Sequence, residues 1–252
     1  MTRALTRTNF HSSRLVRILS DLALVAPVEP GNAFAHKLGQ WVSITDAITL
    51  HAAHSTSPAA KPAKTSAITR TTIGEEFARV RASLEESMTK RGSPKVGKTQ
   101  ISSPNAEVPL DLAPNFEPYR RAYLAHQRDM ELSVRPLRAK VRDVLAKVSP
   151  TLKQLADLDA ALDTILSERE SRLLSAIPAL LEQRFEQLFK IHQQRLAESE
   201  QADHPDFWMK PGGWLARFCH ELQTVLLAEL DARLQPTQGL IEALYHEKTT
   251  SL

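Results

Sequence analysis

Apolar residues recur at three- and four-residue steps from Asn115 onward, and this spacing constrains the fold more than any other feature of the sequence. The series opens with Phe116, Tyr119, Tyr123 and Met130 and continues through the segments that follow. Residues at such steps lie on one face of an α-helix. Only 8 Gly and 6% aromatic residues argue against a turn-rich sheet protein. We therefore predict an all-α fold, an elongated bundle of kinked amphipathic helices.

Proline positions set the expected helix boundaries. The pattern stays in phase across Pro136, which predicts a kink in a long helix and not its end. Ser149 and Pro150 are typical of a helix N-cap followed by the first helical position. Later in the chain, the spacing predicts a helix over residues 214–234, and the sequence from Pro236 on predicts a separate short helix.

Composition divides the chain into three parts. Residues 12–25 and 33–51 have helical spacing on either side of a turn that contains Pro and Gly, which predicts a helical hairpin. The following residues are rich in Pro, Ser, Thr, Ala and Lys and have little apolar surface to bury. The predicted organisation is an N-terminal helical hairpin over 1–54, a flexible basic linker over 55–114 with a short helix at 74–88, and the main helical bundle over 115–252.

Residues 92–99, GSPKVGKT, match the phosphate-binding loop G-x-x-x-x-G-K-[ST]. That loop works between a buried strand and the start of a helix, whose free N–H groups face the phosphates. Here a polar helix end precedes Gly92, and Pro104 follows soon after Thr99. We therefore interpret the match as a chance one and predict no nucleotide chemistry at Lys98.

The segment FEPYRRAYLAHQR, residues 116–128, is one candidate partner-binding face. It combines two tyrosines with three arginines, a set that suits binding of phosphate or of an acidic partner helix. In the alternative interpretation, the tyrosines occupy buried seam positions and the arginines form the solvated side of the helix. The candidate residues are Tyr119, Arg120, Arg121, Tyr123 and Arg128.

A second candidate is the segment HPDFWMKPGGW, residues 204–214, in which Trp208 and Trp214 flank a Pro-Gly-Gly turn. Exposed tryptophans often dominate the binding energy of protein interfaces. In the alternative interpretation, the two tryptophans hold this loop against the end of the bundle. The sequence leaves both interpretations open.

Charge is distributed unevenly along the chain. Residues 1–110 contain 14 Lys and Arg against 8 Asp and Glu, a balance of +6, whereas residues 111–252 carry 18 against 21, a balance of −3. A basic, flexible segment can bind the phosphates of a nucleic acid. The candidates for this alternative function are Lys61, Lys64, Arg70, Lys90, Arg91, Lys95 and Lys98.

Residues suited to catalysis or metal binding are sparse. His51 and His54 share a helical face, but the sequence indicates no third ligand nearby. Cys219 is the single cysteine, which excludes an internal disulfide and fits a reducing compartment. The apolar stretch at 22–28 is too short to cross a membrane. We expect a cytoplasmic protein with no metal site, no cofactor and no enzymatic activity.

Two stretches, PYRRAYLAHQRDME at 118–131 and LLAELDARLQP at 226–236, carry a specific resemblance, which extends to segments 38–50, 114–142, 171–188 and 214–244. They resemble a proteobacterial family designated domain of unknown function 3348. The family has no motif with an assigned role, so the resemblance implies no site residues. It implies a setting: members look like companions of a MotA/TolQ-like inner-membrane motor protein and an OmpA-like peptidoglycan-binding protein, as in Zorya-like anti-phage systems.

The leading hypothesis is a non-enzymatic adaptor of such a defence assembly. It would bind a protein partner encoded nearby, either a component of the motor complex or an effector. A homodimer is compatible with the seam-like helices. The alternative is a nucleic-acid-binding effector that uses the basic linker residues.

Overall fold

The computed structural model describes residues 13–24, 41–55, 67–89, 114–199 and 203–247. Within these ranges there is no β-strand, and the predicted all-α fold is confirmed. The elements are α1 (Arg14–Asp21), α3 (Ile44–Ser55), α4 (Ala67–Thr89), α5 (Glu117–Val148), α6 (Pro150–Leu174), α7 (Ile177–Ser199), the 3₁₀ turn η1 (Pro205–Phe207) and α8 (Trp214–His246).

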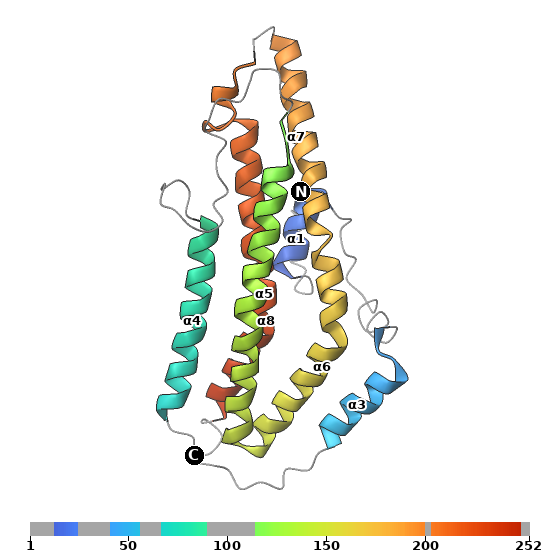
Figure 1. Cartoon of the computed structure of the whole chain (residues 1–252), viewed down its shortest axis with the longest axis vertical. Helices are drawn as coiled ribbons and strands as arrows, with labels where there is room; N and C mark the ends of the chain where they lie inside the picture. Colours follow the sequence, from blue (N-terminus) through green and yellow to red (C-terminus); the bar gives the residue numbers. More distant parts are fainter. Residues whose placement is uncertain (1–12, 25–40, 56–66, 90–113, 200–202, 248–252) are drawn as a thin grey trace, which may run out of the picture.

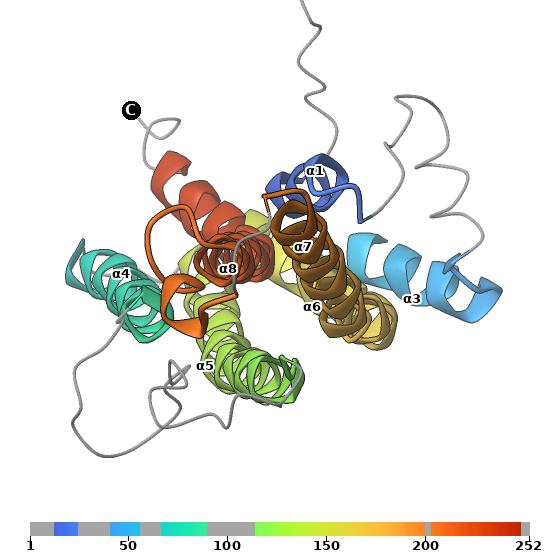
Figure 2. The same cartoon turned by 90° about the horizontal axis from the view of Figure 1, so that it is seen from above.

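Three long passes of the chain form the bundle (Figure 1). Helix α5 runs down the long axis, α6 and α7 return along it one after the other, and α8 runs down again. Helix α8 lies at the centre and packs against α1, α4, α5, α6 and α7 (Figure 2). It is accordingly buried on several sides, since the consecutive residues Ala228, Glu229 and Leu230 are all inaccessible to solvent.

The helix boundaries around Pro136 and Ser149 are confirmed. Pro136 lies inside the continuous helix α5. The Ser149 hydroxyl caps α6 by accepting a 3.2 Å hydrogen bond from the Leu152 N–H. The prediction of a separate last helix is wrong, because α8 continues through Pro236 to His246. Beyond this proline Leu240 and Leu244 are still buried in phase, so packing maintains the helix.

The helix predicted at 74–88 is longer in the structure, because α4 runs from Ala67 to Thr89. This helix packs along α5 and α8 and buries Ile73, Leu84 and Met88. Residues 67–89 therefore belong to the bundle. Their buried apolar residues are widely spaced, so the segment as a whole still has a polar composition. The phosphate-loop match at 92–99 lies outside the described residues.

The two N-terminal helices that the structure describes, α1 and α3, pack on different parts of the bundle. Helix α1 buries Leu15 and Leu19 near α8, whereas α3 lies against α6 (Figure 2). The predicted helix over 33–51 is interrupted at Ser43, whose hydroxyl accepts a 3.1 Å hydrogen bond from the Asp46 N–H and starts α3. Residues 33–40 lie outside the described ranges.

The core differs between the two ends of the bundle. At the aromatic end, near the start of α8, the rings of Phe116, Tyr119, Phe185, Trp214 and Phe218 are buried together. At the aliphatic end, where α5 meets α6, the core consists mainly of Val141, Leu145, Leu152, Leu240 and Leu244.

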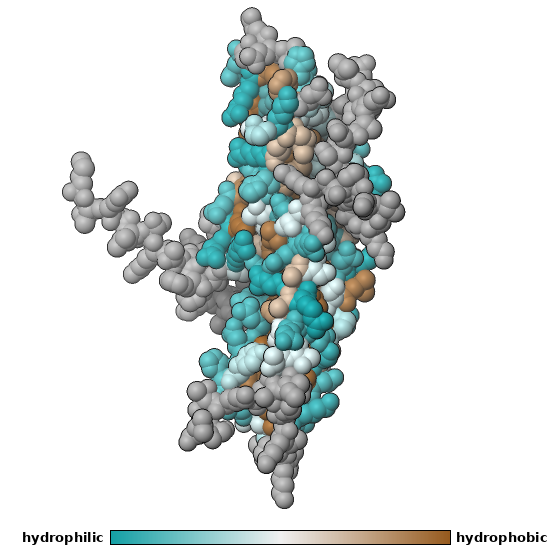
Figure 3. All heavy atoms as spheres, turned by 90° about the vertical axis from the view of Figure 1, so that its left-hand side faces the viewer, coloured by the Kyte–Doolittle hydropathy of each residue, from teal (hydrophilic) through white to brown (hydrophobic). Residues whose placement is uncertain are grey.

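The surface that carries α4 is mainly hydrophilic, and its exposed apolar side chains form small separate spots (Figure 3). None of the described helices combines the length and the apolar composition that a bilayer-crossing segment needs.

Candidate partner-binding site

The loop between α7 and α8 folds tightly over the aromatic end. The Gly213 N–H donates a 2.8 Å hydrogen bond to the Lys210 carbonyl, and Gly212 has a φ of +90°, which favours glycine. A Cβ atom on Gly213 would collide with the backbone carbonyl oxygens of Phe207 and Trp208. The Pro-Gly-Gly sequence is thus what allows the chain to turn this closely into α8.

The two tryptophans have different environments. Trp214 is 7% exposed, and its ring lies 5.2 Å from Phe185 and 5.3 Å from Phe189, centroid to centroid. Trp208 is half-buried, packs 5.5 Å from Trp214, and donates a 2.8 Å hydrogen bond from its indole nitrogen to Asp203. Trp208 of the loop thus packs on Trp214, the buried first residue of α8, as the interpretation of a loop held on the bundle expects, and it stays partly accessible.

Helix α7 supplies the opposite side of the site. His192 stacks on Trp214 at an interplanar angle of 29°, and its Nε2 lies 3.0 Å from the Asp203 carboxylate. One turn further along α7, Arg195 extends from the exposed side of the helix. Neither residue was a sequence candidate, because both lie on a different helix from the tryptophans and no local motif links them.

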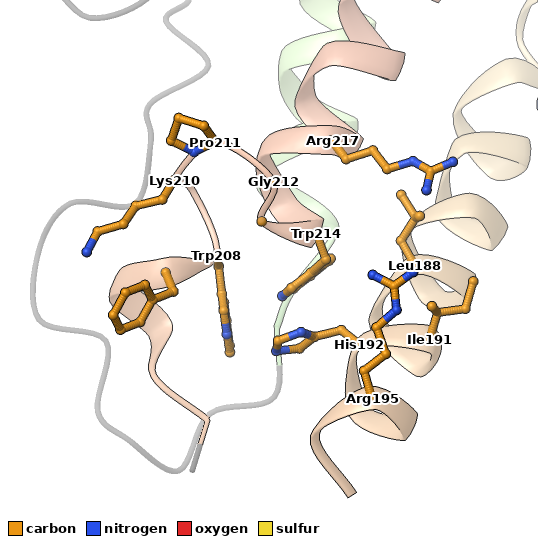
Figure 4. Close-up of a pocket in the computed structure, with 12 residues that line it drawn as sticks. Leu188, Ile191, His192, Arg195, Trp208, Lys210, Pro211, Gly212, Trp214 and Arg217 are labelled. Atoms are coloured by element: carbon orange, nitrogen blue, oxygen red, sulfur yellow. The ribbon is translucent and has the colours of Figure 1, made fainter. Parts of the chain in front are cut away.

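Between this helix and the loop lies a hollow of about 340 Å³, which we call the tryptophan pocket (Figure 4). Its accessible apolar side chains are Phe207, 56% exposed, and Ile191, 42% exposed. Its cations are Arg195, Lys210 and Arg217. The full lining is Leu188, Ile191, His192, Arg195, Phe207, Trp208, Lys210, Pro211, Gly212, Gly213, Trp214 and Arg217.

The structure does not bring the tyrosines and arginines of residues 116–128 to one surface. Tyr119 and Tyr123 are buried, whereas Arg120, Arg121 and Arg128 are exposed on the outside of α5. The predicted face is therefore corrected to its arginines alone. The tyrosines recur at the same three- and four-residue steps as the core residues around them. They therefore lie on the buried face of α5.

Tyr123 belongs to a buried polar network. Its hydroxyl donates a 2.7 Å hydrogen bond to Glu229, which also accepts from Gln127 at 3.0 Å and from Arg233 at 2.8 Å. Burial raises the pKa of the Tyr123 hydroxyl, and the adjacent Glu229 carboxylate raises it further. The charges of Glu229 and Arg233 are paired with each other inside the bundle. The network therefore joins α5 to α8 and leaves no group for a ligand to bind.

A second polar cluster joins α5 to α6. Arg138 and Arg142 each bind both Asp159 and Asp163, at distances of 2.6–2.8 Å between the paired nitrogen and oxygen atoms. Burial raises the pKa of Asp159, but the hydrogen bonds and charges of Arg138 and Arg142 together outweigh it and leave the pKa below the ordinary value. All four groups are saturated by one another, which indicates a structural role.

The nucleic-acid candidates cannot be assembled into a surface. Lys61, Lys64, Lys90, Arg91, Lys95 and Lys98 lie outside the described residues, and Arg70 is placed only as part of the α4 backbone. His51 and His54 are both exposed on α3, and His51 lies 3.3 Å from the Ser55 hydroxyl. Among the described residues, no three His, Cys, Asp or Glu side chains are grouped as metal ligands would be.

A protein-family model described as protein of unknown function (DUF3348) matches residues 1–246. The chain belongs to this family. The DUF3348 match extends over every described helix and includes all residues of the tryptophan pocket. No curated protein and no solved structure matches the chain.

Proposed function

We propose that the protein is a non-enzymatic adaptor that binds another protein through the tryptophan pocket. The observation that carries this proposal is a hollow with exposed Phe207 and Ile191 at its edge, set in a frame of buried rings. Accessible apolar anchors beside cationic side chains are typical of energetically important positions in protein interfaces. A frame that is already packed loses little conformational freedom when a partner binds.

The proposed setting is a Zorya-like anti-phage assembly that contains a MotA/TolQ-like motor and an OmpA-like protein. Support for the setting comes from the resemblance of the segments at 118–131 and 226–236, and is separate from the argument for the pocket. In this setting the partner is a motor-complex component or an effector encoded beside the protein.

Co-purification with the native gene neighbours tests the adaptor function. We expect a stoichiometric protein partner that stays bound to the tagged full-length chain at both low and high salt. We also expect the double variant Phe207→Ala, Ile191→Ala to lose this partner while its helical circular dichroism is unchanged. Recovery of no protein partner from the native neighbourhood would refute the adaptor function.

The alternative, a nucleic-acid-binding effector, rests on the basic residues at 61–98. Deleting the whole basic region would be a poor test, because α4 buries Leu84 and Met88 in the core. Substitution of Lys61, Lys64, Lys90, Arg91, Lys95 and Lys98 by glutamine removes the charge and leaves α4 in place. Steeply salt-dependent nucleic-acid binding that this variant loses would support the alternative.

A further inference from the structure

We propose that the tryptophan pocket recognises an acidic peptide segment of the partner, in which a carboxylate side chain stands next to an apolar one. This inference rests on the proposed adaptor function and adds the chemistry of the partner. It is argued from the charge, the hydrogen-bond donors and the apolar surface of the pocket.

The residues that line the pocket carry only positive charge, and the nearby Asp203 carboxylate is occupied by His192 and Trp208. None of its 12 lining residues is acidic, and three are Arg or Lys. Arg217 is held at 2.9 Å by Glu221, which Arg184 also binds. Arg195 and Lys210 form no ion pair with any side chain that the structure describes; Lys210 lies 3.9 Å above the Phe207 ring centroid. In Figure 4 the Arg195 guanidinium lies between α7 and the loop, where an anionic group can bind it, whereas Lys210 extends from the outer side of the loop and adds positive charge there.

The polar groups of the pocket side chains are mainly hydrogen-bond donors. The guanidinium of Arg195 and the ammonium of Lys210 can only donate. The indole N–H of Trp214 is buried and has no acceptor in the described part of the chain; Figure 4 shows it on the ring edge that faces Trp208 and His192. The Asp203 carboxylate beside these rings already accepts from Trp208. A carboxylate, which only accepts, complements this set.

The apolar surface favours a peptide over a nucleic acid. Ile191 and Leu188 are aliphatic, and one face of the Phe207 ring is covered by Lys210. Trp208 packs against Trp214 and Phe189, so its ring is not an open platform on which a base could stack. A volume of about 340 Å³ accommodates one or two side chains. An acidic residue beside a leucine or an aromatic residue fits both the volume and the charge.

Peptide selection against the full-length chain tests this chemistry. A displayed library of random twelve-residue peptides is selected on the wild type, on Arg195→Glu, Lys210→Glu, and on the matched control Arg135→Glu, Lys153→Glu. The control makes the same change in charge on exposed residues of α5 and α6 that belong neither to the pocket nor to the other candidate face. All three proteins are first shown to have equal thermal unfolding midpoints.

We expect the wild type and the control to enrich peptides with Asp or Glu next to Leu, Phe or Trp, and the pocket variant to lose them. For one enriched peptide, fluorescence anisotropy should show affinity at least about tenfold weaker on the pocket variant. Enrichment without an acidic bias, equal enrichment on the pocket variant, or no enrichment would each overturn the inference. Oligo-dT is added at the same concentration of negative charges as the peptide. If it displaces the peptide, the inference is overturned in favour of a nucleic acid.

The same pocket variant separates this inference from the adaptor function. If it retains the co-purified partner, the adaptor function stands and the acidic-peptide chemistry of the pocket falls. If the wild type itself yields no partner, the adaptor function falls. Loss of the partner by the pocket variant, with retention by the control variant, would support both.

Discussion

The aromatic and aliphatic ends of the bundle are both tightly buried, and the tryptophan pocket lies at the aromatic end. At the aliphatic end, small branched side chains such as Val141 and Leu145 fill the space between helices, and the Arg138 and Asp159 cluster binds α5 to α6. At the aromatic end, rings meet at tilted and edge-on angles, and a loop closes over them.

In the proposed function, this difference separates stability from recognition within one bundle. Large planar side chains are held rigidly by edge-to-face contacts. At the margin of such a cluster, the loop does not fill all the space beside the rings, and a recess is left. At the other end, the charged groups face each other across two helices and are satisfied. At the aromatic end, Arg195 forms no ion pair with a described side chain and lies beside apolar surface, which is the arrangement on which the proposed binding site rests.

The largest effect is expected from Phe218→Ala. Phe218 is inaccessible to solvent and its ring lies within 6.1 Å of those of Phe116, Tyr119 and Phe185. Its truncation should reduce the free energy of unfolding by about 3–5 kcal/mol, and Leu145→Ala at the aliphatic end by about 2–5 kcal/mol. Urea unfolding followed by circular dichroism measures both.

Tryptophan emission shows whether the two ends are independent. In a Trp41→Phe background, only Trp208 and Trp214 report, because the chain has 3 tryptophans. Phe218→Ala should shift this emission in the folded state, whereas Leu145→Ala should leave it unchanged. An equal shift in both variants would contradict the separation of the two ends.

The next effect is expected from Gly213→Ala, where the new Cβ would collide with backbone carbonyl oxygens of the loop. We expect a loss of about 1–3 kcal/mol and an altered tryptophan emission, because the loop must move. Gly239→Ala is the matched control: it lies in α8 near the aliphatic end with open space around its Cβ position. It should stabilise the protein by about 0.5–1 kcal/mol. Destabilisation at Gly239 and none at Gly213 would contradict this account.

The sequence predicted those features that depend on one helix at a time. The spacing from Phe116 onward gave the long helices, and the in-phase pattern across Pro136 gave a continuous one. The series also continues in phase across Pro236 through Leu240 and Leu244, so the separate last helix predicted from that proline is wrong. Packing on a central helix outweighs the loss of one hydrogen bond.

The site could be predicted only in part, because its two sides come from different segments. Trp208 and Trp214 were visible as aromatic residues around a Pro-Gly-Gly turn. His192 and Arg195 contribute only through the packing of α7 on α8, which no short motif encodes. Tyr119 and Tyr123 show the opposite error, since residues grouped in sequence are divided by the helix into core and surface.

A smaller effect, which depends on pH, is expected from Asp159→Asn at the aliphatic end. The pKa of Asp159 is lower in the folded protein than its ordinary value, so the unfolded chain binds a proton more readily. The stabilisation is therefore complete above about pH 4 and is lost as the pH falls through the folded-state pKa. At pH 7 the variant should lose about 1–2 kcal/mol, because the cluster is only partly buried.

Urea unfolding at pH 7, 5, 4 and 3 checks this sign. The difference between wild type and Asp159→Asn should shrink as the pH falls. At the aromatic end, burial raises the pKa of Glu221, but Arg184 and Arg217 lower it by more, so Glu221→Gln should show the same trend. A difference that grows with acidity in either variant would contradict the predicted direction.

The smallest effect is expected between the two ends, at Asp231 on α8. Its carboxylate binds Arg14 of α1 at 2.5 Å and Arg81 of α4 at 2.7 Å, so one half-buried acid holds helices on two sides of α8. Because these side chains are 25–53% exposed, Asp231→Asn should cost only about 0.5 kcal/mol globally, and less at high salt. Helix α1, with only Leu15 and Leu19 fully buried, should nevertheless exchange its amide hydrogens faster. Asp157→Asn, which breaks an exposed pair within α6 alone, is the control. If exchange in α1 is unchanged, its two leucines suffice to hold it on the bundle, and the ion pair adds nothing to its position.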